Sequence, residues 1–219
     1  MLSCMDLSPI RAPPAVLLMR LYREMTLMSS HFLAYMARMK LIRRWSLMRN
    51  TQDENDLEHS AMVSFVAHML AVLRQERYHE AVDIRLVLEY ALYHEAAEVI
   101  TGDLASPIKY FNPDISDAFK YIERLASQKM LAYLPEDLMH HYEKMLFPQE
   151  ASVEWRLVKA ADKITAYLKC VEETRQGNCE FAQAESSILG QIESIDLPEV
   201  RDFMREFAPS FGLPLDGLN

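Results

Sequence analysis

Hydrophobic side chains recur at helical spacing along most of this chain. Phe32, Leu33, Met36 and Met39 mark the first such run, with basic residues between them. Further runs of the same kind follow, and no stretch alternates between apolar and polar residues as a half-buried strand does. The pattern predicts helices over about residues 30–42, 56–78, 83–100, 113–135, 135–147, 151–176, 179–192 and 197–207. We therefore expect a single, bundle-like, all-α domain.

The breaks between these runs carry residues that commonly begin or end helices. Asn55 or Asp56 is placed to cap the second helix after a polar loop. Gly102 is placed to stop the third helix, and Pro113 suits the first turn of the fourth. The segment between them, residues 102–112, is expected to form a structured loop.

Composition narrows the classes of function. The 219 residues include only 5 Gly but 14 Met, and their formal net charge is -9. Little glycine and abundant helix-forming residues agree with an all-α fold. A chain with this charge lacks the broad basic face that binds a nucleic acid polymer, so we expect none as a partner. A small anionic substrate remains compatible, because a few local cations are enough to bind it.

The cysteines and the N-terminal region bear on the location of the protein. The three cysteines show no CxxC spacing, so we expect no disulfide framework and a reducing, cytoplasmic setting. No apolar run approaches the roughly 18 residues of a membrane span, so no membrane is expected as a partner. The apolar patch near the N-terminus is interrupted by Arg20, Arg23 and Glu24, unlike a signal peptide. We interpret residues 1–27 as a dispensable extension.

A few polar residues in apolar surroundings are candidates for chemistry. His94 and Glu95 are adjacent near the end of a predicted helix, and Glu98 follows one turn later. An imidazole beside a carboxylate suits a divalent metal. Asp162 lies on an apolar helix face, where a carboxylate is costly unless it is paired or bound to a metal. His59 lies at the start of the second helix. Taken alone, these residues could equally be solvated charges, an ion-paired carboxylate and a capping or core histidine.

The order of these residues resembles the signature of a known family. His59, then His94 with its adjacent carboxylate, then Asp162 is similar to the H…HD…D pattern of the HD-domain phosphohydrolases. Four segments look like those of the bacterial 5'-deoxynucleotidases of the YfbR type: MSSHFLAYMARMKLIRRWSLMRN, ENDLEHS, YHEAAEVITGDLASPIKYFN and LVKAADKITAYLKC. The resemblance covers about residues 28–210 and leaves residues 211–219 as a C-terminal tail. It implies an HD-domain helical bundle.

The resemblance also implies a role for each matching residue. It implies one divalent metal ion, such as cobalt or manganese, with the ligands His59, His94, Glu95 and Asp162. Arg44 and Glu98 are the implied catalytic residues. The implied substrate-binding residues are Arg44, Trp45, His59, Glu95, Asp103, Leu104, Ala105, Ser106 and Asp162. The implied enzyme is a cytoplasmic homodimer that hydrolyses nucleoside 5'-monophosphates, preferring 2'-deoxy ones because Trp45 would crowd a ribose 2'-hydroxyl.

Two departures from the family pattern leave alternatives open. The usual His-Asp pair is here His94-Glu95, and the usual Leu-Pro-Thr of the substrate loop is here Leu104-Ala105-Ser106. The extra methylene of Glu95 could move a ligand oxygen by roughly 1 Å, which can lower a rate by ~100-fold. The alternatives are an HD-type hydrolase of a cyclic nucleotide, a nucleotide triphosphate or an alarmone, and a metal-binding protein whose active site has decayed.

Overall fold

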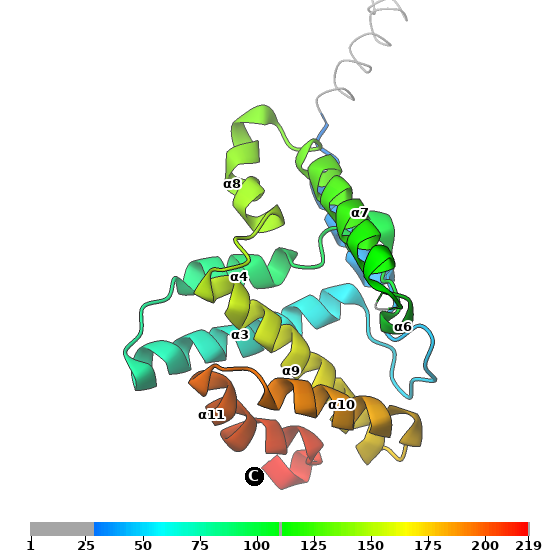
Figure 1. The fold of residues 1–219 in the computed structure, drawn as a ribbon, viewed down its shortest axis with the longest axis vertical. Helices are drawn as coiled ribbons and strands as arrows, with labels where there is room; N and C mark the ends of the chain where they lie inside the picture. The colour runs from blue at the N-terminus through cyan, green and yellow to red at the C-terminus, as the bar shows by residue number, and fades with distance from the viewer. Residues whose placement is uncertain (1–28, 110, 219) are drawn as a thin grey trace, which may run out of the picture.

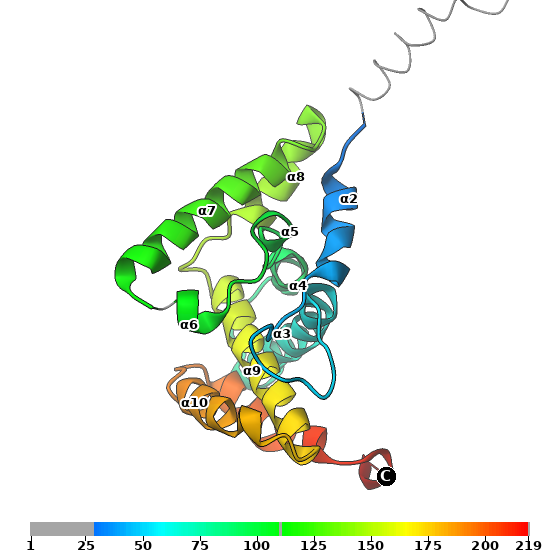
Figure 2. The ribbon, with the colours of Figure 1, turned by 90° about the vertical axis from the view of Figure 1, so that its right-hand side faces the viewer.

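The computed structural model describes residues 29–109 and 111–218 (Figures 1 and 2). Within these ranges every regular element is a helix, and a single isolated bridge joins Arg43 to Asn55. The predicted all-α fold class is therefore confirmed for the described residues. In this part of the chain, no helix has both the length and the apolar character needed to cross a bilayer. The predicted extension, residues 1–27, lies outside the described residues.

Three helices form the centre of the molecule. α3 (Asp56–Tyr78), α4 (Ile84–Tyr93) and α9 (Val153–Arg175) pack against one another, and α9 crosses α3 (Figure 1). Their facing sides bury an apolar cluster that includes Val63, Leu70, Val87, Leu157 and Ile164. The candidate site lies where these three helices meet.

The starts of α3 and α9 follow from the local sequence. The Asn55 side chain accepts hydrogen bonds from the backbone N–H groups of Leu57 and Glu58. The Glu58 carboxylate in turn accepts one from the Asn55 N–H, which completes a capping box. Ser152 caps α9 by accepting a bond from an N–H in its first turn. Of the two predicted caps of α3, Asn55 is therefore the one used.

Two further groups of helices cover this centre. α10 (Ala182–Glu193) packs on α9, and α11 (Pro198–Glu206) packs on α3 (Figure 1). At the other end of the molecule, α7 (Pro113–Leu131) and α8 (Glu136–Leu146) form a hairpin that packs against α2 (Phe32–Met36). A second, smaller core lies here and consists of Phe32, Ala96, Met130 and Leu146. The short elements are η1 (Ala37–Leu41), α5 (Glu98–Thr101), α6 (Ser106–Lys109), η2 (Cys179–Phe181), η3 (Ala208–Gly212) and η4 (Leu215–Leu218).

The helix predicted over residues 83–100 is wrong as a single element. α4 ends just before His94, and a tight turn separates it from α5, which begins at Glu98. The His94 ring explains the break, because its Nδ1–H donates to the Ala91 carbonyl at 2.8 Å. In a continuous helix that carbonyl would accept the N–H of Glu95. Glu98 was predicted to share a helix face with His94 because one regular helix would carry both. The break between α4 and α5 removes that regular spacing.

Other predicted boundaries differ by smaller amounts. The first predicted helix, residues 30–42, consists of α2 followed by the 3₁₀ turn η1. The predicted loop over residues 102–112 contains the short helix α6, and the helix after it ends at Leu131 rather than near residue 135. The predicted stop at Gly102 is confirmed, and its φ of 72° lies in the region that favours glycine.

A loop of residues 43–55, here called the 43–55 loop, joins η1 to α3 and is held at both ends. At its base, the Arg44 N–H donates to the Glu54 carbonyl at 3.0 Å. At its far end, the buried Glu173 carboxylate of α9 accepts hydrogen bonds from the N–H and hydroxyl of Thr51, at 2.9 and 2.7 Å. The loop that carries Arg44 is therefore built into the folded framework.

The Glu173 carboxylate is expected to make stability sensitive to acid. Burial raises its pKa, but hydrogen bonds from Lys169, Thr51 and Asn178 outweigh this effect and lower the pKa to about 2. A carboxylate with a depressed pKa in the folded state stabilises the fold above its unfolded value and loses this contribution as the pH falls toward its folded value. Between about pH 6 and about pH 3, we expect wild type to lose ~2 kcal/mol more free energy of unfolding than Glu173→Gln. Urea denaturation at each pH measures this difference, and parallel losses would contradict it.

Candidate metal centre

Four side chains meet where the central helices converge. His59 comes from α3, His94 and Glu95 come from the turn after α4, and Asp162 comes from the middle of α9. One possible ligand atom of each residue lies within 4.8 Å of those of the other three. Two imidazoles and two carboxylates are a suitable donor set for a borderline divalent metal. The structure thus brings together the four residues that the sequence predicts as metal ligands.

The backbone orients the His94 ring toward this cluster. Because Nδ1–H donates to the Ala91 carbonyl, the lone pair of the ring lies on Nε2. That Nε2 atom is buried, and no described residue gives it a hydrogen bond. Burial also lowers the pKa of His94 below its usual value, which keeps the ring neutral. A buried, neutral and unpartnered nitrogen beside two carboxylates fits a metal ligand.

His59 and Asp162 form the other half of the cluster. His59 Nε2 lies 3.0 Å from Asp162 Oδ1, and the His59 side chain is fully buried. The other ring nitrogen, Nδ1, lies 3.9 Å from Glu54 Oε1. Lys159 Nζ donates to Asp162 Oδ2 at 2.8 Å. Burial raises the pKa of Asp162, but Lys159 and His59 outweigh this effect and hold the pKa well below its ordinary value. The carboxylate is therefore ionised.

Glu95 reaches the cluster and also contacts a buried cation. Its Oε1 atom lies 3.4 Å from His94 Nε2 and 4.0 Å from His59 Nε2. The same oxygen lies 3.4 Å from Arg44 Nη1. Burial raises the pKa of Glu95, but electrostatic interactions with the neighbouring His94 and Arg44 outweigh this effect, and the pKa is lowered overall. Glu95 thus links the ligand cluster to Arg44.

Arg44 lies among carboxylates on the 43–55 loop. Its Nε atom is 3.4 Å from Glu54 Oε2, and its Nη1 atom is 3.8 Å from Asp56 Oδ1. Burial alone would lower the pKa of Arg44, but the surrounding carboxylates raise it above the usual value, so the side chain is a permanent cation. A planar guanidinium in this place can contact two oxygens of a phosphate.

Asp56 and Glu98 form a buried acidic pair beside Arg44. Asp56 is fully buried and Glu98 is 6% exposed, and each carboxyl group influences the pKa of the other. Burial is the main cause that raises the pKa of Asp56 to about 7. Burial and the nearby carboxylates together raise the pKa of Glu98 to about 11. Glu98, which the sequence predicts to be catalytic, is therefore protonated near neutral pH.

Trp45 has an uncommon backbone conformation next to Arg44. Its φ of 56° lies in the left-handed region, which costs a residue with a side chain roughly 1–2 kcal/mol. The indole Nε1–H donates to Glu54 Oε2 at 3.1 Å. The indole also packs on Phe181, with the ring centroids 5.3 Å apart. Glu54 thus contacts both Arg44 and Trp45, the two residues predicted to bind substrate from this loop.

The predicted substrate loop follows α5. Burial raises the pKa of Asp103, and the charge of Asp103 interacts with that of Arg44, so Asp103 lies near the cluster. Leu104 and Ala105 are half-buried, whereas Ser106 is exposed and begins α6. The structure therefore brings Asp103 to the candidate site and leaves Ser106 at the exposed end of the loop.

Three residues that contact the site were not among the predicted site residues. Lys159 carried a signal in the sequence, because a residue three positions before Asp162 lies one helical turn away. Glu54 and Asp56 carried none, although Asp56 was a candidate helix cap. Both residues reach Arg44 because the 43–55 loop folds back on itself. The local sequence does not predict this folding.

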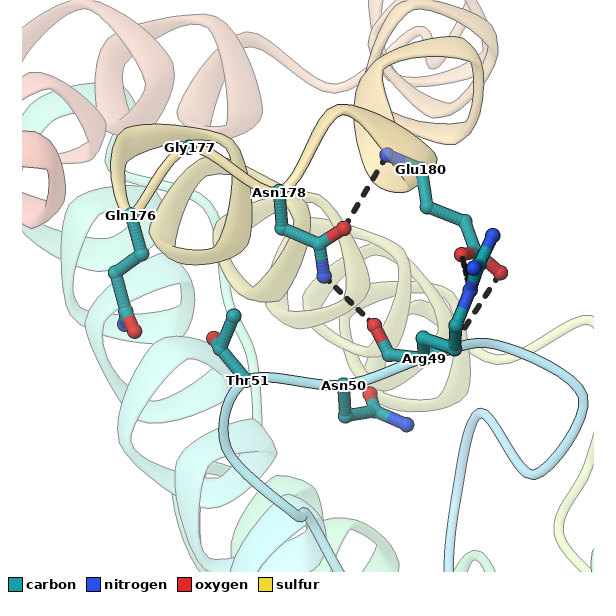
Figure 3. A pocket seen from close by; sticks show the side chains of 7 residues that line it. All are labelled: Arg49, Asn50, Thr51, Gln176, Gly177, Asn178 and Glu180. Carbon is teal, nitrogen blue, oxygen red and sulfur yellow. Dashed lines mark hydrogen bonds and ion pairs between the residues drawn. The ribbon is translucent and has the colours of Figure 1, made fainter.

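A pocket of about 430 Å³ lies apart from the four candidate ligands. Figure 3 shows its walls, with Arg49 and Thr51 of the 43–55 loop facing the end of α9. The Asn178 side chain donates to the Arg49 carbonyl at 2.7 Å, and the Arg49 guanidinium pairs with Glu180 at the same distance. None of its lining residues is a predicted site residue. The pocket marks where the loop docks on the end of α9.

The chain is similar in sequence to a known family. The family model described as 5'-deoxynucleotidase YfbR-like matches residues 31–211. A protein of Vibrio vulnificus named 5'-deoxynucleotidase is 44% identical over 191 residues, which cover 87% of this chain and 98% of that protein. A protein of Yersinia pseudotuberculosis with the same name is 45% identical over 191 residues, which cover 87% of this chain and 97% of that protein.

Solved structures share the fold at lower identity. An HD-domain phosphohydrolase from Listeria innocua has a TM-score of 0.73 at 22% identity, with 83% of this chain and 88% of that chain covered. The cyanophage S-2L HD phosphohydrolase, solved with dA and one catalytic Zn²⁺ ion, has a TM-score of 0.57 at 20% identity. The match covers 81% of this chain and 95% of that chain. These likenesses confirm the predicted HD-domain helical bundle.

Proposed function

This chain belongs to the YfbR-like 5'-deoxynucleotidase family, and on that premise we propose that it hydrolyses nucleoside 5'-monophosphates, preferring 2'-deoxy ones, to nucleoside and phosphate. The proposed enzyme is a metal-dependent phosphoric monoester hydrolase. One observation supports this best: the buried Arg44 guanidinium lies 3.4 Å from Glu95, within a four-residue cluster that suits a divalent metal. This arrangement sets a phosphate-binding cation directly beside a candidate metal site.

We assign the metal to His59, His94, Glu95 and Asp162, whose donors suit one divalent ion such as cobalt or manganese. When bound, such an ion supplies Lewis acidity, which lowers the pKa of a water molecule and polarises a phosphoryl group. The chain itself contributes two imidazoles and two carboxylates in a buried setting. Burial strengthens the electrostatic interactions of these groups with a charged substrate.

The residues around the metal cluster supply the substrate contacts in this proposal. Arg44 binds and orients the phosphate through its planar fork. Glu98, protonated beside Asp56, donates a hydrogen bond to a phosphate oxygen. Trp45 lines the sugar side and crowds a ribose 2'-hydroxyl, while Asp103 accepts a hydrogen bond from a sugar hydroxyl. Leu104, Ala105 and Ser106 complete the substrate loop.

Glu95→Asp is expected to lower kcat/KM for a deoxynucleoside monophosphate by about 10-fold or more. The wild-type carboxylate reaches both His94 and Arg44, and a side chain shorter by one methylene cannot keep both contacts without movement. A displacement of roughly 1 Å can lower a rate by ~100-fold. Initial rates combined with measured metal content test this expectation. A rise in activity would instead support the alternative that the wild-type site has decayed.

The proposed function is tested by phosphate release from the purified full chain. The panel crosses divalent cobalt, manganese, zinc and magnesium with deoxynucleoside and ribonucleoside 5'-monophosphates, a cyclic nucleotide, a nucleotide triphosphate and an alarmone. We expect metal-dependent release that is fastest from a deoxynucleoside monophosphate. Faster turnover of one of the last three substrates would replace the proposal with another HD-type hydrolase. Metal binding without turnover of any substrate would make the chain a metal-binding protein.

The proposal also covers the location, the oligomeric state and the domain bounds of the enzyme. We infer a cytoplasmic homodimer whose substrate is a small nucleotide and not a nucleic acid polymer, in line with the net charge of -9. Tyr121, Ile122 and Leu125 are exposed on α7 and offer an apolar surface for a second copy. We place the catalytic domain at residues 28–210, with residues 211–219 as a tail. Light scattering coupled to size exclusion tests the oligomeric state.

A further inference from the structure

One buried ion pair of α9 contributes to holding the far end of the 43–55 loop. Glu173 is 1% exposed, Lys169 is 5% exposed, and their charged atoms lie 2.5 Å apart. Both lie on the helix that carries Asp162, with Lys169 seven residues and Glu173 eleven residues further on, or roughly 10 and 16 Å along the helix axis. Neither residue can therefore touch the metal cluster, and the proposed mechanism uses neither.

The Glu173 carboxylate is saturated with hydrogen bonds from the loop. Its oxygens accept bonds from the Thr51 N–H and hydroxyl and from the Gln52 N–H, at 2.7–3.2 Å. Asn178 Nδ2 donates to the same carboxylate at 2.8 Å, and to the Arg49 carbonyl at 2.7 Å. Figure 3 shows the Asn178 side chain reaching the Arg49 backbone of the loop at this junction. One carboxylate thus ties the loop both to the body of α9 and to its end.

Lys169 attaches the same loop and also supports an aromatic platform. Its Nζ atom donates to the Gln52 carbonyl at 2.5 Å. The same atom lies 5.8 Å from the centroid of Phe181, a fully buried ring. Phe181 is in turn the ring against which Trp45 packs. The ion pair therefore supports Trp45 from two directions, through the backbone of the loop and through Phe181.

The conformation of Trp45 needs such support. A large side chain at φ 56° persists only where surrounding contacts impose it. Its carbonyl accepts hydrogen bonds from the Met48 N–H at 2.9 Å and the Asn50 side chain at 3.2 Å. Asn50 directly precedes the residue that Glu173 holds. Release of the loop at Glu173 would loosen these contacts and let the indole move.

We propose that Glu173, paired with Lys169, is a positioning residue that sets the sugar selectivity of the enzyme by fixing Trp45. This inference rests on the proposed function, because selectivity is defined on nucleotide substrates. Glu173 acts through Trp45 and makes no contact with the substrate. A purely structural role would lower stability and would reduce activity on deoxyribonucleotides and ribonucleotides alike. A positioning role changes the ratio between them.

The test compares three full-chain variants with wild type, each loaded with the same metal. Glu173→Gln removes the charge, and Lys169→Met combined with Glu173→Met removes the pair without leaving an uncompensated buried charge. Arg49→Ala is the matched control, because it breaks the 2.7 Å pair of the same loop with Glu180 at a side chain that is 93% exposed. Each protein is assayed for kcat and KM on a deoxynucleoside 5'-monophosphate and on the matching ribonucleotide.

We expect the deoxy-to-ribo ratio of kcat/KM to fall by about 10-fold or more in the Glu173 variants, mainly through a lower KM for the ribonucleotide. Metal content should stay at the wild-type level, and Arg49→Ala should keep the wild-type ratio. An unchanged ratio in a folded, metal-loaded Glu173 variant overturns the inference, whatever happens to stability. If Glu173→Gln does not fold, the double variant decides by the same criterion.

A second measurement separates this inference from the proposed function. The chain has two tryptophans, so Trp155→Phe leaves Trp45 as the single emitter. In that background, Glu173→Gln should shift the Trp45 emission to the red, because the indole becomes more exposed. Arg49→Ala should leave the emission unchanged. This readout needs no turnover. If wild type hydrolyses no nucleotide, the proposed function fails, and the emission alone decides whether Glu173 positions Trp45. Unchanged emission then overturns the inference.

Discussion

His94→Ala is expected to lower phosphate release by at least ~1000-fold and to strip the bound divalent metal. The substitution removes the buried Nε2 atom that the Ala91 carbonyl orients toward the cluster. A bound metal supplies several kcal/mol of transition-state stabilisation, and about 4 kcal/mol corresponds to ~1000-fold in rate. Metal content after gel filtration and initial rates on a deoxynucleoside monophosphate measure the two effects. They should fall together.

The matched control for this prediction is His68→Ala. His68 lies on α3, the helix that carries His59, but its side chain is exposed and belongs to no ligand cluster among the described residues. We expect His68→Ala to keep its metal and its activity. His94→Ala protein that retains stoichiometric metal and turns over at the wild-type rate would refute the assignment of this histidine.

The helices could be predicted because their signal is local. The capping box at Asn55, the glycine at the end of α5 and the apolar spacing of α9 all depend on neighbours within about one turn. The break after α4 could not be predicted in this way. It depends on the His94 side chain capturing the Ala91 carbonyl, and apolar spacing carries no information about that choice. A candidate metal ligand thereby overrode the local helical pattern.

The residues of the candidate site also differ in whether local sequence could predict them. His59, His94 and Asp162 were suggested by unusual local settings, and the resemblance to a family joined them into one cluster. Glu54 and Glu173 gave no signal, because each acts through the folding of the 43–55 loop onto distant helices. Such contacts join residues far apart in the sequence, and hydrophobic periodicity does not record them.

Arg44→Ala is expected to lower kcat/KM for a deoxynucleoside monophosphate by about 100-fold or more while the metal stays bound. Arg44 lies beside the ligand cluster without belonging to it, so its removal takes away the phosphate-binding cation and leaves the four donors in place. A charge-assisted, bidentate hydrogen bond to phosphate in a largely buried site is strong enough to account for an effect of about this size. Arg44→Lys should recover only part of the activity, because an ammonium group lacks the planar fork. Steady-state rates and metal content measure both effects.

Arg43→Ala gives this prediction its control. Arg43 is the preceding residue of the same loop, but its side chain is 74% exposed and pairs with Asp53 at 3.3 Å, so its removal should leave rates unchanged. Removal of Arg44 instead leaves Glu54, Asp56 and Glu95 without the cation that they share. Metal loss in Arg44→Ala, or equal effects at both arginines, would contradict the separation of phosphate binding from metal binding. That separation distinguishes a phosphohydrolase with a dedicated phosphate-binding cation from a protein that only holds a metal.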